Sequence, residues 1–451
     1  MAAVSPARKA AFGILMAVDR GQAHSDELLR GKAVSVLSAP DRNLATTLVL
    51  GVLRWQIQLD HRLHSLLARP NAKLDSEIQI ALRLGAFQLL HLDRIPARAA
   101  IDESVELAKQ SGHRFASGMV NAVLRKLATI ATKHPDTESN LALGYAHPAW
   151  MVDRWTASFG VETACAICQH DQMPPSLSIR MESPAVEAEL VEAGISLMPG
   201  QLLTLSRTVI SGDITDTQAF KQGRLRIQDE GSQLVAEIAA SIAVKSADAI
   251  LDCCAAPGGK TFILAERNPQ ARIVACESSP QRHEQLRKRL APLGDRVECR
   301  LADATVFNEL SRYDLVLADV PCSGTGTLGR NPEIRHRLQI QDFARQSERQ
   351  RAILESAVNA VRTGGNVVYS TCSLEPEENE HVVAAVVQYF AKLRIVPLGP
   401  HIDAMNAAGI LTNSGALALR SSVTPEGYLR LMPGQFGTDG FFIACLQKIS
   451  N

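Results

Sequence analysis

The second half of the chain contains five short apolar runs that alternate with helical segments, and this rhythm constrains the fold more than any other feature. The runs occupy residues 249–253, 273–277, 297–301, 315–319 and 366–370. Strands that alternate with helices and are apolar throughout are typical of a parallel sheet covered on both faces. The sequence therefore predicts a doubly wound α/β domain, with a late antiparallel edge strand at residues 441–446.

The first part of the chain has the apolar spacing of amphipathic helices. Ser5-Pro6 and Pro40-Asp41 mark helix starts, and further helices are predicted from Asp75, from Ala99 and from Ala116. A polar stretch at residues 132–139 is the predicted linker, and short strands alternate with helices up to residue 227. We therefore predict an all-α domain over 1–131, linker helices with a small α+β unit over 140–235, and the α/β domain over 236–451.

Length and composition agree with several packed domains. The chain has 451 residues, of which 46% are apolar, and this exceeds what one hydrophobic core normally serves. Nine cysteines, two of them adjacent, do not form a disulfide framework and indicate a reducing compartment. Cys165 and Cys168 have CxxC spacing without a second pair, so we predict no metal site. No apolar run is long enough for a membrane span and no signal peptide is evident, so we expect a cytoplasmic protein.

The formal net charge is zero, but basic residues gather in two places. The first cluster precedes and enters a predicted helix, and it contains Arg330, Arg335, His336, Arg337, Arg345, Arg349 and Arg351. The second lies within a predicted helix, and it contains Arg282, Arg287, Lys288 and Arg289. Such clusters can neutralise RNA phosphates. Acidic residues interleave with the first cluster, and a solvated helix face therefore explains it equally well.

A tight turn of small residues follows the first predicted strand of the α/β domain. It reads Cys254-Ala255-Ala256-Pro257-Gly258-Gly259-Lys260 and leads into a helix. In such a turn, backbone N–H groups and the helix amino end can approach a ligand closely. A nucleoside triphosphate loop would require glycine where Cys254 stands, and the turn lacks the GxGxxG pattern of dinucleotide sites.

Acidic residues stand at the ends of the next three predicted strands. They are Glu277, Asp303 and Asp319. An acid at the end of the second strand can accept hydrogen bonds from both ribose hydroxyls. Carboxylates in series suit a nucleoside with a cationic centre better than a polyphosphate, and S-adenosylmethionine is such a ligand. Each acid could instead cap the helix that follows it.

Two thiols stand at strand ends as well. Cys322 follows the fourth predicted strand and Cys372 follows the fifth, and the two strands are neighbours in the predicted winding. Reacting groups of an open α/β sheet collect beyond the carboxyl ends of its strands, so both thiols are predicted to border one crevice. The alternative is that each is a small buried hydrophobic residue, as free cysteines usually are.

Several of these motifs resemble known families. Residues 101–109 and 120–125 are similar to the RNA-binding NusB antitermination fold. The turn at 254–260, Pro321-Cys322, Ser370-Thr371-Cys372-Ser373 and Asp439-Gly440-Phe441-Phe442 together resemble the RNA cytosine-5 methyltransferases of the Sun or Fmu group. The resemblance covers essentially the whole chain and implies a Rossmann-like class I methyltransferase domain that uses S-adenosylmethionine.

The resemblance also implies roles for individual residues. Carbon 5 of cytosine is a weak nucleophile until a thiolate adds to carbon 6, and the family's nucleophile corresponds to Cys372. Cys322 corresponds to the thiol that releases product, and Asp319 is expected to hydrogen-bond nitrogen 3. The cofactor contacts correspond to residues 254–260 with Glu277, Asp303 and Asp319. DNA cytosine methyltransferases use their Pro-Cys thiol as nucleophile, which leaves Cys322 as the competing assignment.

The expected partner is 16S ribosomal RNA, naked or in an early 30S assembly intermediate, and the expected state is a monomer. A transfer RNA cytosine-5 methyltransferase and a non-catalytic RNA-binding assembly or antitermination factor are the alternatives. Two departures from the family pattern stand out. Arg180-Met181-Glu182 replaces an Arg-x-Asn segment, which puts an RNA contact there in doubt, and Glu277 replaces a frequent aspartate while retaining the acceptor.

Overall fold

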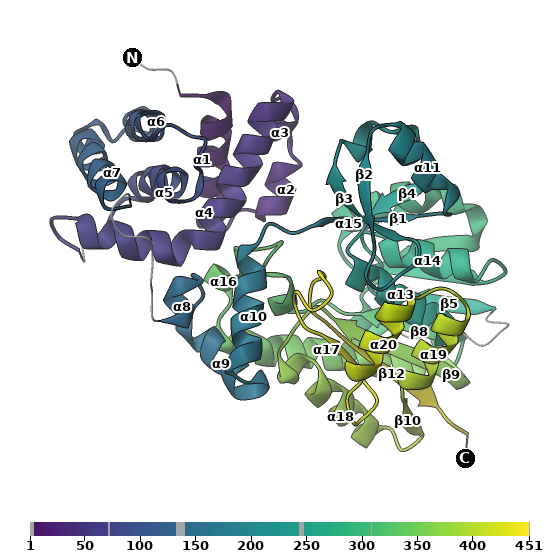
Figure 1. The fold of residues 1–451 in the computed structure, drawn as a ribbon. Helices are drawn as coiled ribbons and strands as arrows, with labels where there is room; N and C mark the ends of the chain where they lie inside the picture. Colours follow the sequence, from purple (N-terminus) through teal and green to yellow (C-terminus); the bar gives the residue numbers. More distant parts are fainter. Residues whose placement is uncertain (1–3, 71–72, 132–139, 243–247, 308, 451) are drawn as a thin grey trace. The chain divides into compact units, whose positions relative to one another are not determined.

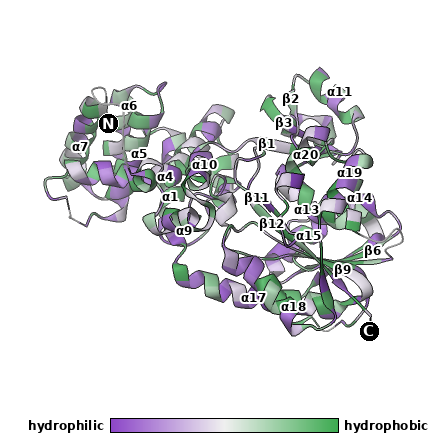
Figure 2. Cartoon of the chain, turned by 60° about the horizontal axis from the view of Figure 1, so that its bottom comes forward, coloured by the Kyte–Doolittle hydropathy of each residue, from purple (hydrophilic) through white to green (hydrophobic). Residues whose placement is uncertain are grey.

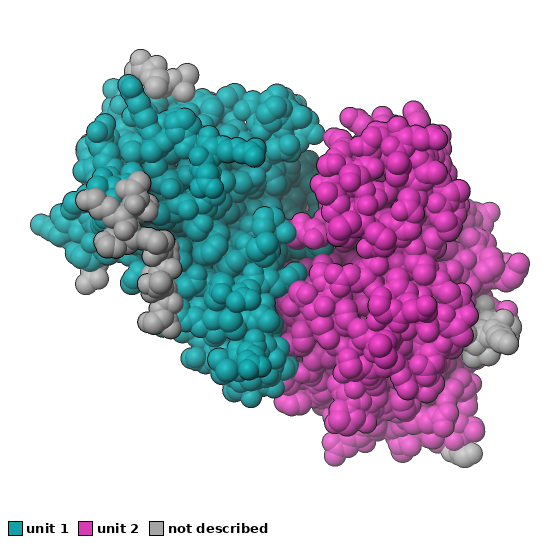
Figure 3. Space-filling view, in the orientation of Figure 1, with its two compact units in different colours: residues 1–174, 328–337 teal, residues 175–327, 338–451 magenta. Residues whose placement is uncertain are grey.

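The computed structural model of this chain describes residues 4–70, 73–131, 140–242, 248–307 and 309–450. They form two compact units, which Figure 3 shows in separate colours. Unit 1 contains Met1–Pro174 and Leu328–Arg337, and unit 2 contains Pro175–Thr327 and Leu338–Asn451. The three-domain division made from the sequence stays a prediction, and the predicted linker at 132–139 lies outside the described residues.

Unit 1 is helical in its described part, as predicted for the first domain (Figure 1). Its elements are α1 (Pro6–Asp19), α2 (Ser25–Leu29), α3 (Lys32–Ser35), α4 (Ala39–Leu66), α5 (Ser76–His91), α6 (Ala97–Gln110), η1 (Arg114–Ala116), α7 (Ser117–Ala131), α8 (Leu141–Gly144), α9 (Ala149–Phe159), α10 (Val161–Gln172) and α16 (Ile334–Arg337). The predicted helix starts hold. Pro6 and Pro40 both lie in the first turn of a helix, where a missing N–H costs nothing.

One apolar core joins helices α1 and α4–α7. It contains Leu48, Leu59, Leu84 and Leu124, none of which is exposed. Helices α4 and α5 approach closely at Gly51. A Cβ atom at this position would lie 2.0 Å from the Phe87 ring, so a larger residue would not fit there. Helices α8–α10 join this bundle through polar contacts to α4, such as the hydrogen bond that Gln58 Nε2 donates to the Gly144 carbonyl at 3.2 Å.

Unit 2 contains two sheets. The smaller has the strand order β2-β3-β1-β4 and is formed by β1 (Leu177–Met181), β2 (Ser196–Pro199), β3 (Ser206–Ser211) and β4 (Leu225–Ile227), with α11 (Ala185–Glu192), η2 (Ile214–Asp216) and α12 (Gln218–Lys221). Buried Arg180 of β1 forms ion pairs with Glu237 at 2.8 Å and with Glu266 at 3.2 Å. The guanidinium of the unusual Arg180-Met181-Glu182 segment therefore attaches the small sheet to two helices of the α/β region.

The larger sheet has the order β10-β12-β9-β8-β5-β6-β7, with β11 paired to β12. Its strands are β5 (Ala249–Asp252), β6 (Arg272–Glu277), β7 (Val297–Leu301), β8 (Tyr313–Asp319), β9 (Val361–Thr371), β10 (Leu393–Val396), β11 (Leu429–Leu431) and β12 (Phe441–Lys448). The five predicted strands, β5–β9, are parallel to one another. The prediction of β12 as an edge strand is wrong, because it is antiparallel but pairs with β9 on one side and β10 on the other.

Helices cover both faces of this sheet. They and the short helical turns are α13 (Glu230–Ile242), α14 (Gly259–Arg267), α15 (Pro280–Leu290), η3 (Ala291–Arg296), η4 (Ala304–Val306), η5 (Thr325–Thr327), α17 (Ile340–Ala360), η6 (Pro376–Glu378), α18 (Glu380–Tyr389), α19 (Gly399–Ala407) and α20 (Asn413–Ser421). Along β8, Leu315 and Leu317 join one apolar core, and Val316 and Ala318 join the other. This alternation confirms the doubly wound prediction. Figure 2 shows hydrophilic and hydrophobic residues alternating along α17, as expected for a helix with one face on a sheet.

Residues 328–337 follow the loop after β8 in the chain, yet they belong to unit 1. Arg54 Nη2 donates to the Gly329 carbonyl at 2.8 Å, and Arg335 Nη1 donates to the carbonyls of Arg54 and Ala146, each at 3.2 Å. Buried Glu333 accepts hydrogen bonds from the N–H and hydroxyl of Ser25. We call residues 328–337 the inserted segment. Its side chains and backbone are thus an integral part of the helical unit.

Candidate active site

The two predicted thiols meet at the carboxyl ends of adjacent parallel strands. Asp319 at the end of β8 pairs in register with Ser370 of β9. The loops that follow these strands bring the Sγ atoms of Cys322 and Cys372 to 3.3 Å. The Gly326 N–H donates to the Cys372 carbonyl at 2.9 Å, which holds the two loops together beyond the sulfurs. The strand order of the sheet is therefore what makes one site from two distant motifs.

The environments of the two sulfurs differ. The hydrogen bond to Cys372, together with burial, raises the pKa of Cys322 well above its usual value. A thiol that remains protonated donates its hydrogen to the neighbouring sulfur. Only the thiolate form of cysteine is strongly nucleophilic. The raised pKa of Cys322 therefore favours its thiol form.

A lysine and an aspartate lie at the same strand ends. Lys260 Nζ forms an ion pair with Asp319 Oδ2 at 2.7 Å, and the Ser370 hydroxyl donates to Asp319 Oδ1 at 2.7 Å. Burial alone would lower the pKa of Lys260, but the charge and hydrogen bond of Asp319 raise it above its ordinary value. Lys260 is therefore a fixed cation. It holds the carboxylate of Asp319 in one orientation beside the thiols.

The predicted turn links β5 to α14 as expected. Gly258 adopts φ 100° at the N-cap of α14, and a Cβ there would lie 3.1 Å from the side chains of Leu286 and Leu290. Only glycine adopts this backbone conformation without strain. The peptide bond between Ala256 and Pro257 is cis. The turn lies at the carboxyl end of β5, and most of its residues line a cavity.

Two cavities border the turn and share Cys254, Ala256 and Asp319 in their walls. The first, of about 200 Å³, also contains Glu277 and Asp303, and the second, of about 100 Å³, contains Lys260. The first cavity is lined by the predicted cofactor residues Cys254, Ala256, Glu277, Asp303 and Asp319. The second is lined by the remaining ones, Ala255, Pro257, Gly259 and Lys260, with the exception of Gly258. Carboxylates around a small polar cavity next to exposed backbone fit a nucleoside with a cationic centre.

The alternative that the acids cap helices holds for one of them. Asp303 Oδ1 accepts from both the N–H and the hydroxyl of Thr305, and these hydrogen bonds lower the pKa of Asp303. Glu277 accepts from the Ser279 N–H at 2.8 Å and faces Arg282 at 3.5 Å. Asp303 therefore uses one oxygen for local structure and Glu277 uses both, and both residues still contribute to the wall of the cavity.

Two acidic residues of the site were not predicted from the sequence. Asp252 ends β5, is 1% exposed and accepts from the Thr261 hydroxyl at 2.7 Å. Burial and the charge of Asp319 raise the pKa of Asp252 to about 7. Its position as the last residue of a strand before the turn was the available signal. Glu378 is fully buried beneath the two thiol loops, and it follows Cys372 too closely in sequence to look like more than a helix start.

The predicted arginine cluster around residues 330–351 is divided between the units. Arg335 is 2% exposed and binds backbone carbonyls, so it does not face RNA phosphates. Arg345 and Arg351 form ion pairs with Asp342 and Glu355 along α17, as expected for a solvated helix face. Arg349 lines the first cavity beside Asp303.

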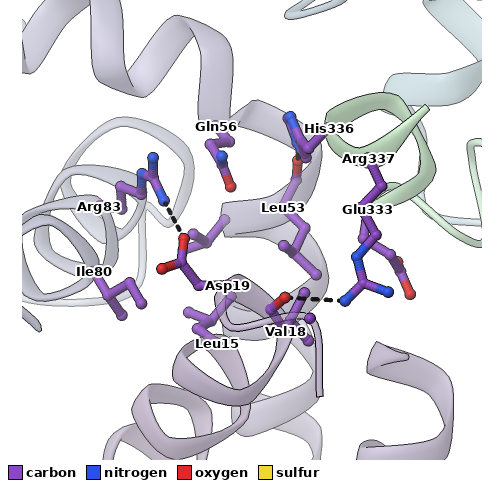
Figure 4. A pocket seen from close by; sticks show the side chains of 12 residues that line it. Leu15, Val18, Asp19, Leu53, Gln56, Ile80, Arg83, Glu333, His336 and Arg337 are labelled. Atoms are coloured by element: carbon purple, nitrogen blue, oxygen red, sulfur yellow. Dashed lines mark hydrogen bonds and ion pairs between the residues drawn. The ribbon is translucent and has the colours of Figure 1, made fainter. Parts of the chain in front are cut away.

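Unit 1 has a cavity of its own, of about 340 Å³, between helices α1, α4 and α5 and the inserted segment. Figure 4 shows Arg83 facing Asp19 on one side and Arg337 reaching the Val18 carbonyl on the other. Arg83 also forms a bidentate contact with Asp60. The charged groups of this cavity bind partners within unit 1, whereas the thiols and the turn lie in unit 2. In the residues described, no group of three or more His, Cys, Asp or Glu side chains is placed to hold a metal ion, and no helix is long and apolar enough to cross a bilayer.

The doubly wound sheet, the glycine turn and the strand-end carboxylates define a class I methyltransferase that depends on S-adenosylmethionine. Residues 239–447 match the model of the 16S rRNA methyltransferase RsmB/F family, and residues 5–129 match that of the NusB family. The chain belongs to the RsmB/F family of rRNA methyltransferases and carries a NusB domain at its amino end.

Similarity extends over the whole chain. It is 33% identical to a probable ribosomal RNA small subunit methyltransferase B of Bacillus subtilis (strain 168), with 98% of both proteins covered. It is 30% identical to the ribosomal RNA small subunit methyltransferase B of Pseudomonas putida, again with 98% of both covered.

Solved structures share the fold. The crystal structure of PH0851 has a TM-score of 0.77 and 24% identity over 99% of this chain and all of that one, a likeness that shows the fold alone. A methyltransferase homolog protein from Pyrococcus horikoshii has a TM-score of 0.55 and 25% identity, covering 68% of this chain and 98% of that one.

Proposed function

We propose that this enzyme forms 5-methylcytosine at one position of 16S ribosomal RNA, through a covalent bond between Cys372 and carbon 6 of the base. The observation that supports it most is the 3.3 Å separation of two thiols beside the Lys260–Asp319 ion pair. Methyl transfer to an oxygen or an exocyclic nitrogen needs no thiol nucleophile, so two sulfurs at the methyl-accepting site favour carbon 5 chemistry. The names of the similar proteins support ribosomal RNA of the small subunit as substrate.

The chain's own residues perform the steps around the base. The Cys372 thiolate adds to carbon 6 while nitrogen 3 takes up a proton, which the Lys260–Asp319 pair is placed to supply, and the resulting enamine is nucleophilic at carbon 5. S-adenosylmethionine supplies the electrophilic methyl group, and residues 254–260 with Glu277, Asp303 and Asp319 would hold it. Lys260 fixes Asp319 at 2.7 Å, so that carboxylate enters the reaction already oriented.

Product release requires transfer of the carbon 5 proton to a base at the site, and the C–H electron pair re-forms the carbon 5–carbon 6 double bond as the Cys372 thiolate leaves. Cys322 lies next to the sulfur that must leave and is the residue we assign to this stage. The target base must be unpaired or flipped, because a stacked base hides carbon 6 from a thiol.

A pair of alanine variants tests the roles. We expect Cys372→Ala to form no covalent complex with RNA that contains 5-fluorocytosine, because the attacking sulfur is gone. We expect Cys322→Ala to form the complex with this RNA and, unlike the unaltered enzyme, to retain a complex with RNA that contains ordinary cytosine, since release is impaired. Denaturing gel electrophoresis separates the complex from free protein. If Cys322→Ala fails to form the complex and Cys372→Ala succeeds, the two assignments are reversed.

The substrate is tested separately with tritiated S-adenosylmethionine. We expect label in unmodified 16S rRNA and none in transfer RNA, with bisulfite sequencing identifying the cytosine. Label in transfer RNA alone would favour the transfer RNA alternative. A protein that binds 16S rRNA but transfers no label to either RNA would favour the non-catalytic assembly factor.

A further inference from the structure

A fully buried carboxylate lies beneath the two thiol loops. Glu378 is the last residue of η6, six positions after Cys372, and it has no exposed surface. It lies outside the predicted cofactor site and forms hydrogen bonds with both loops. A buried ionised carboxylate is costly unless its oxygens are hydrogen-bonded.

Four hydrogen-bond donors surround the carboxylate. Oε1 accepts from the Ser323 N–H and from Gln350 Nε2, each at 2.9 Å. Oε2 accepts from the hydroxyls of Ser323 and Ser373. An ionised carboxylate is an acceptor only, and four donors match its capacity. The surroundings of Glu378 are therefore complementary to the charged form.

The donors come from the residues that directly follow the two thiols. Ser323 follows Cys322 and Ser373 follows Cys372, so one carboxylate binds both neighbours of the reacting sulfurs. Gln350 extends the arrangement, because its Nε2 also donates to the Pro321 carbonyl at 3.0 Å, on the other side of Cys322. The loops share further hydrogen bonds, from the Gly326 N–H to the Cys372 carbonyl, from the Leu374 N–H to the Thr325 hydroxyl, and between the Ser323 and Ser373 hydroxyls. Among these contacts, Glu378 is the charged group.

We propose that Glu378 is a positioning residue that sets the separation of the Cys322 and Cys372 sulfurs by binding Ser323 and Ser373 together. The proposal deepens the proposed function, on which it rests, and concerns only how the two thiols are held. Charge-assisted hydrogen bonds are roughly twice as strong as neutral ones, so an amide in the same place holds the loops less firmly.

The first test measures the thiol pair without RNA. Dibromobimane becomes fluorescent when it bridges two nearby thiols, and Cys322→Ser gives the background from the remaining cysteines. We expect Glu378→Gln to slow bridging by about tenfold, the factor that loss of one charge-assisted hydrogen bond produces. The matched control is Glu380→Gln, because Glu380 pairs with Arg430 and binds neither serine. It should bridge at the rate of the unaltered enzyme.

The second test measures the reaction. Single-turnover methylation of 16S rRNA by Glu378→Gln should slow by about tenfold to a hundredfold, as a small displacement of reacting groups does. Calorimetric affinity for S-adenosylmethionine should stay within about twofold, because the cofactor residues are untouched. If Glu378→Gln does not fold, Ser323→Ala and Ser373→Ala, which each remove one donor, take its place in both measurements.

The outcomes separate the two proposals. Unchanged bridging and methylation rates in a folded Glu378→Gln, or in the serine variants where it does not fold, overturn the positioning role. If the unaltered enzyme methylates no RNA cytosine, the proposed function fails, and the bridging rates still decide whether Glu378 positions the thiols. Slower bridging in the Glu380→Gln control would also overturn the proposal, since the effect would then not depend on the serine contacts.

Discussion

Cys322 and Cys372 have different environments although their sulfurs lie 3.3 Å apart. The difference comes from the hydrogen bond between them, which together with burial raises the pKa of Cys322. Both cysteines could be identified in the sequence because each follows an apolar strand. Which of them attacks could not be decided from residue types, since the direction of a shared hydrogen depends on the three-dimensional environment of each sulfur.

Asp252 gives a pH-dependent prediction at the residue scale. Its pKa of about 7 means that the carboxyl is mostly protonated at pH 6 and mostly ionised at pH 8. A carboxylate in the wall of the second cavity attracts a cationic ligand more than a neutral one. We therefore expect the affinity for S-adenosylmethionine, relative to that for neutral S-adenosylhomocysteine, to increase as the pH rises through this range.

Isothermal titration calorimetry at pH 6, 7 and 8 measures this ratio. Asp252→Asn, which retains an acceptor for the Thr261 hydroxyl, should make the ratio nearly constant with pH. A ratio in the unaltered enzyme that is constant or falls with rising pH would contradict the assignment of this ionisation to the cofactor site.

At the scale of elements, the inserted segment was interpreted from the sequence as an exposed basic surface, but its contacts bury part of it inside unit 1. Its basic residues look like an RNA-binding cluster in the sequence, but Arg335 binds two carbonyls inside unit 1. Sequence periodicity identified helices α1, α4 and α5 because each buries an apolar stripe. It could not show that a polar segment is buried, because the partners are backbone carbonyls that no sequence motif marks.

Strand β12 illustrates a second limit of the same kind. Its apolar run was recognised, and so was its antiparallel direction. Its place between β9 and β10 was not, because β10 has only four residues, of which just Leu393 is fully buried. Short edge strands carry little apolar signal, so the strand that ends the sheet is the least visible one.

The contact between Glu333 and Ser25 can be tested through the inserted segment. Glu333→Gln replaces a charged acceptor of two hydrogen bonds by a neutral one, at a site that is 1% exposed. Weakening a hydrogen bond to a buried charged group costs about 1.5–3 kcal/mol, so local opening of residues 328–337 should become at least about tenfold more frequent. Amide hydrogen exchange of this peptide measures the change.

The control for this variant is Glu348→Gln, which makes the same chemical change on an exposed position of α17. It should leave the exchange of residues 328–337 as in the unaltered protein. Equal exchange in Glu333→Gln and in the unaltered protein would show that the Ser25 contact does not hold the segment.

At the scale of the whole molecule, the chain does not finish one unit before it begins the next. The boundary between the units is crossed at Pro174–Pro175, at Thr327–Leu328 and again at Arg337–Leu338. All residues assigned to the thiol and cofactor sites belong to unit 2, while the inserted segment that follows the Cys322 loop is completed by unit 1. Removing the amino-terminal part therefore removes the partners of a segment that the catalytic part retains.

A shortened chain of residues 175–451 should show which properties unit 2 has by itself and which ones need unit 1. We expect it to bind S-adenosylmethionine within about threefold of the full chain and to bridge Cys322 and Cys372 with dibromobimane, because both sites are complete within unit 2. Residues 328–337 should exchange amide hydrogens almost without protection, since Arg54, Ala146 and Ser25 are absent. Methylation of 16S rRNA should be lost with the NusB domain.

Protection of residues 328–337 equal to that in the full chain would mean that the segment folds without unit 1. Loss of cofactor binding would mean that the methyltransferase unit does not fold or function by itself.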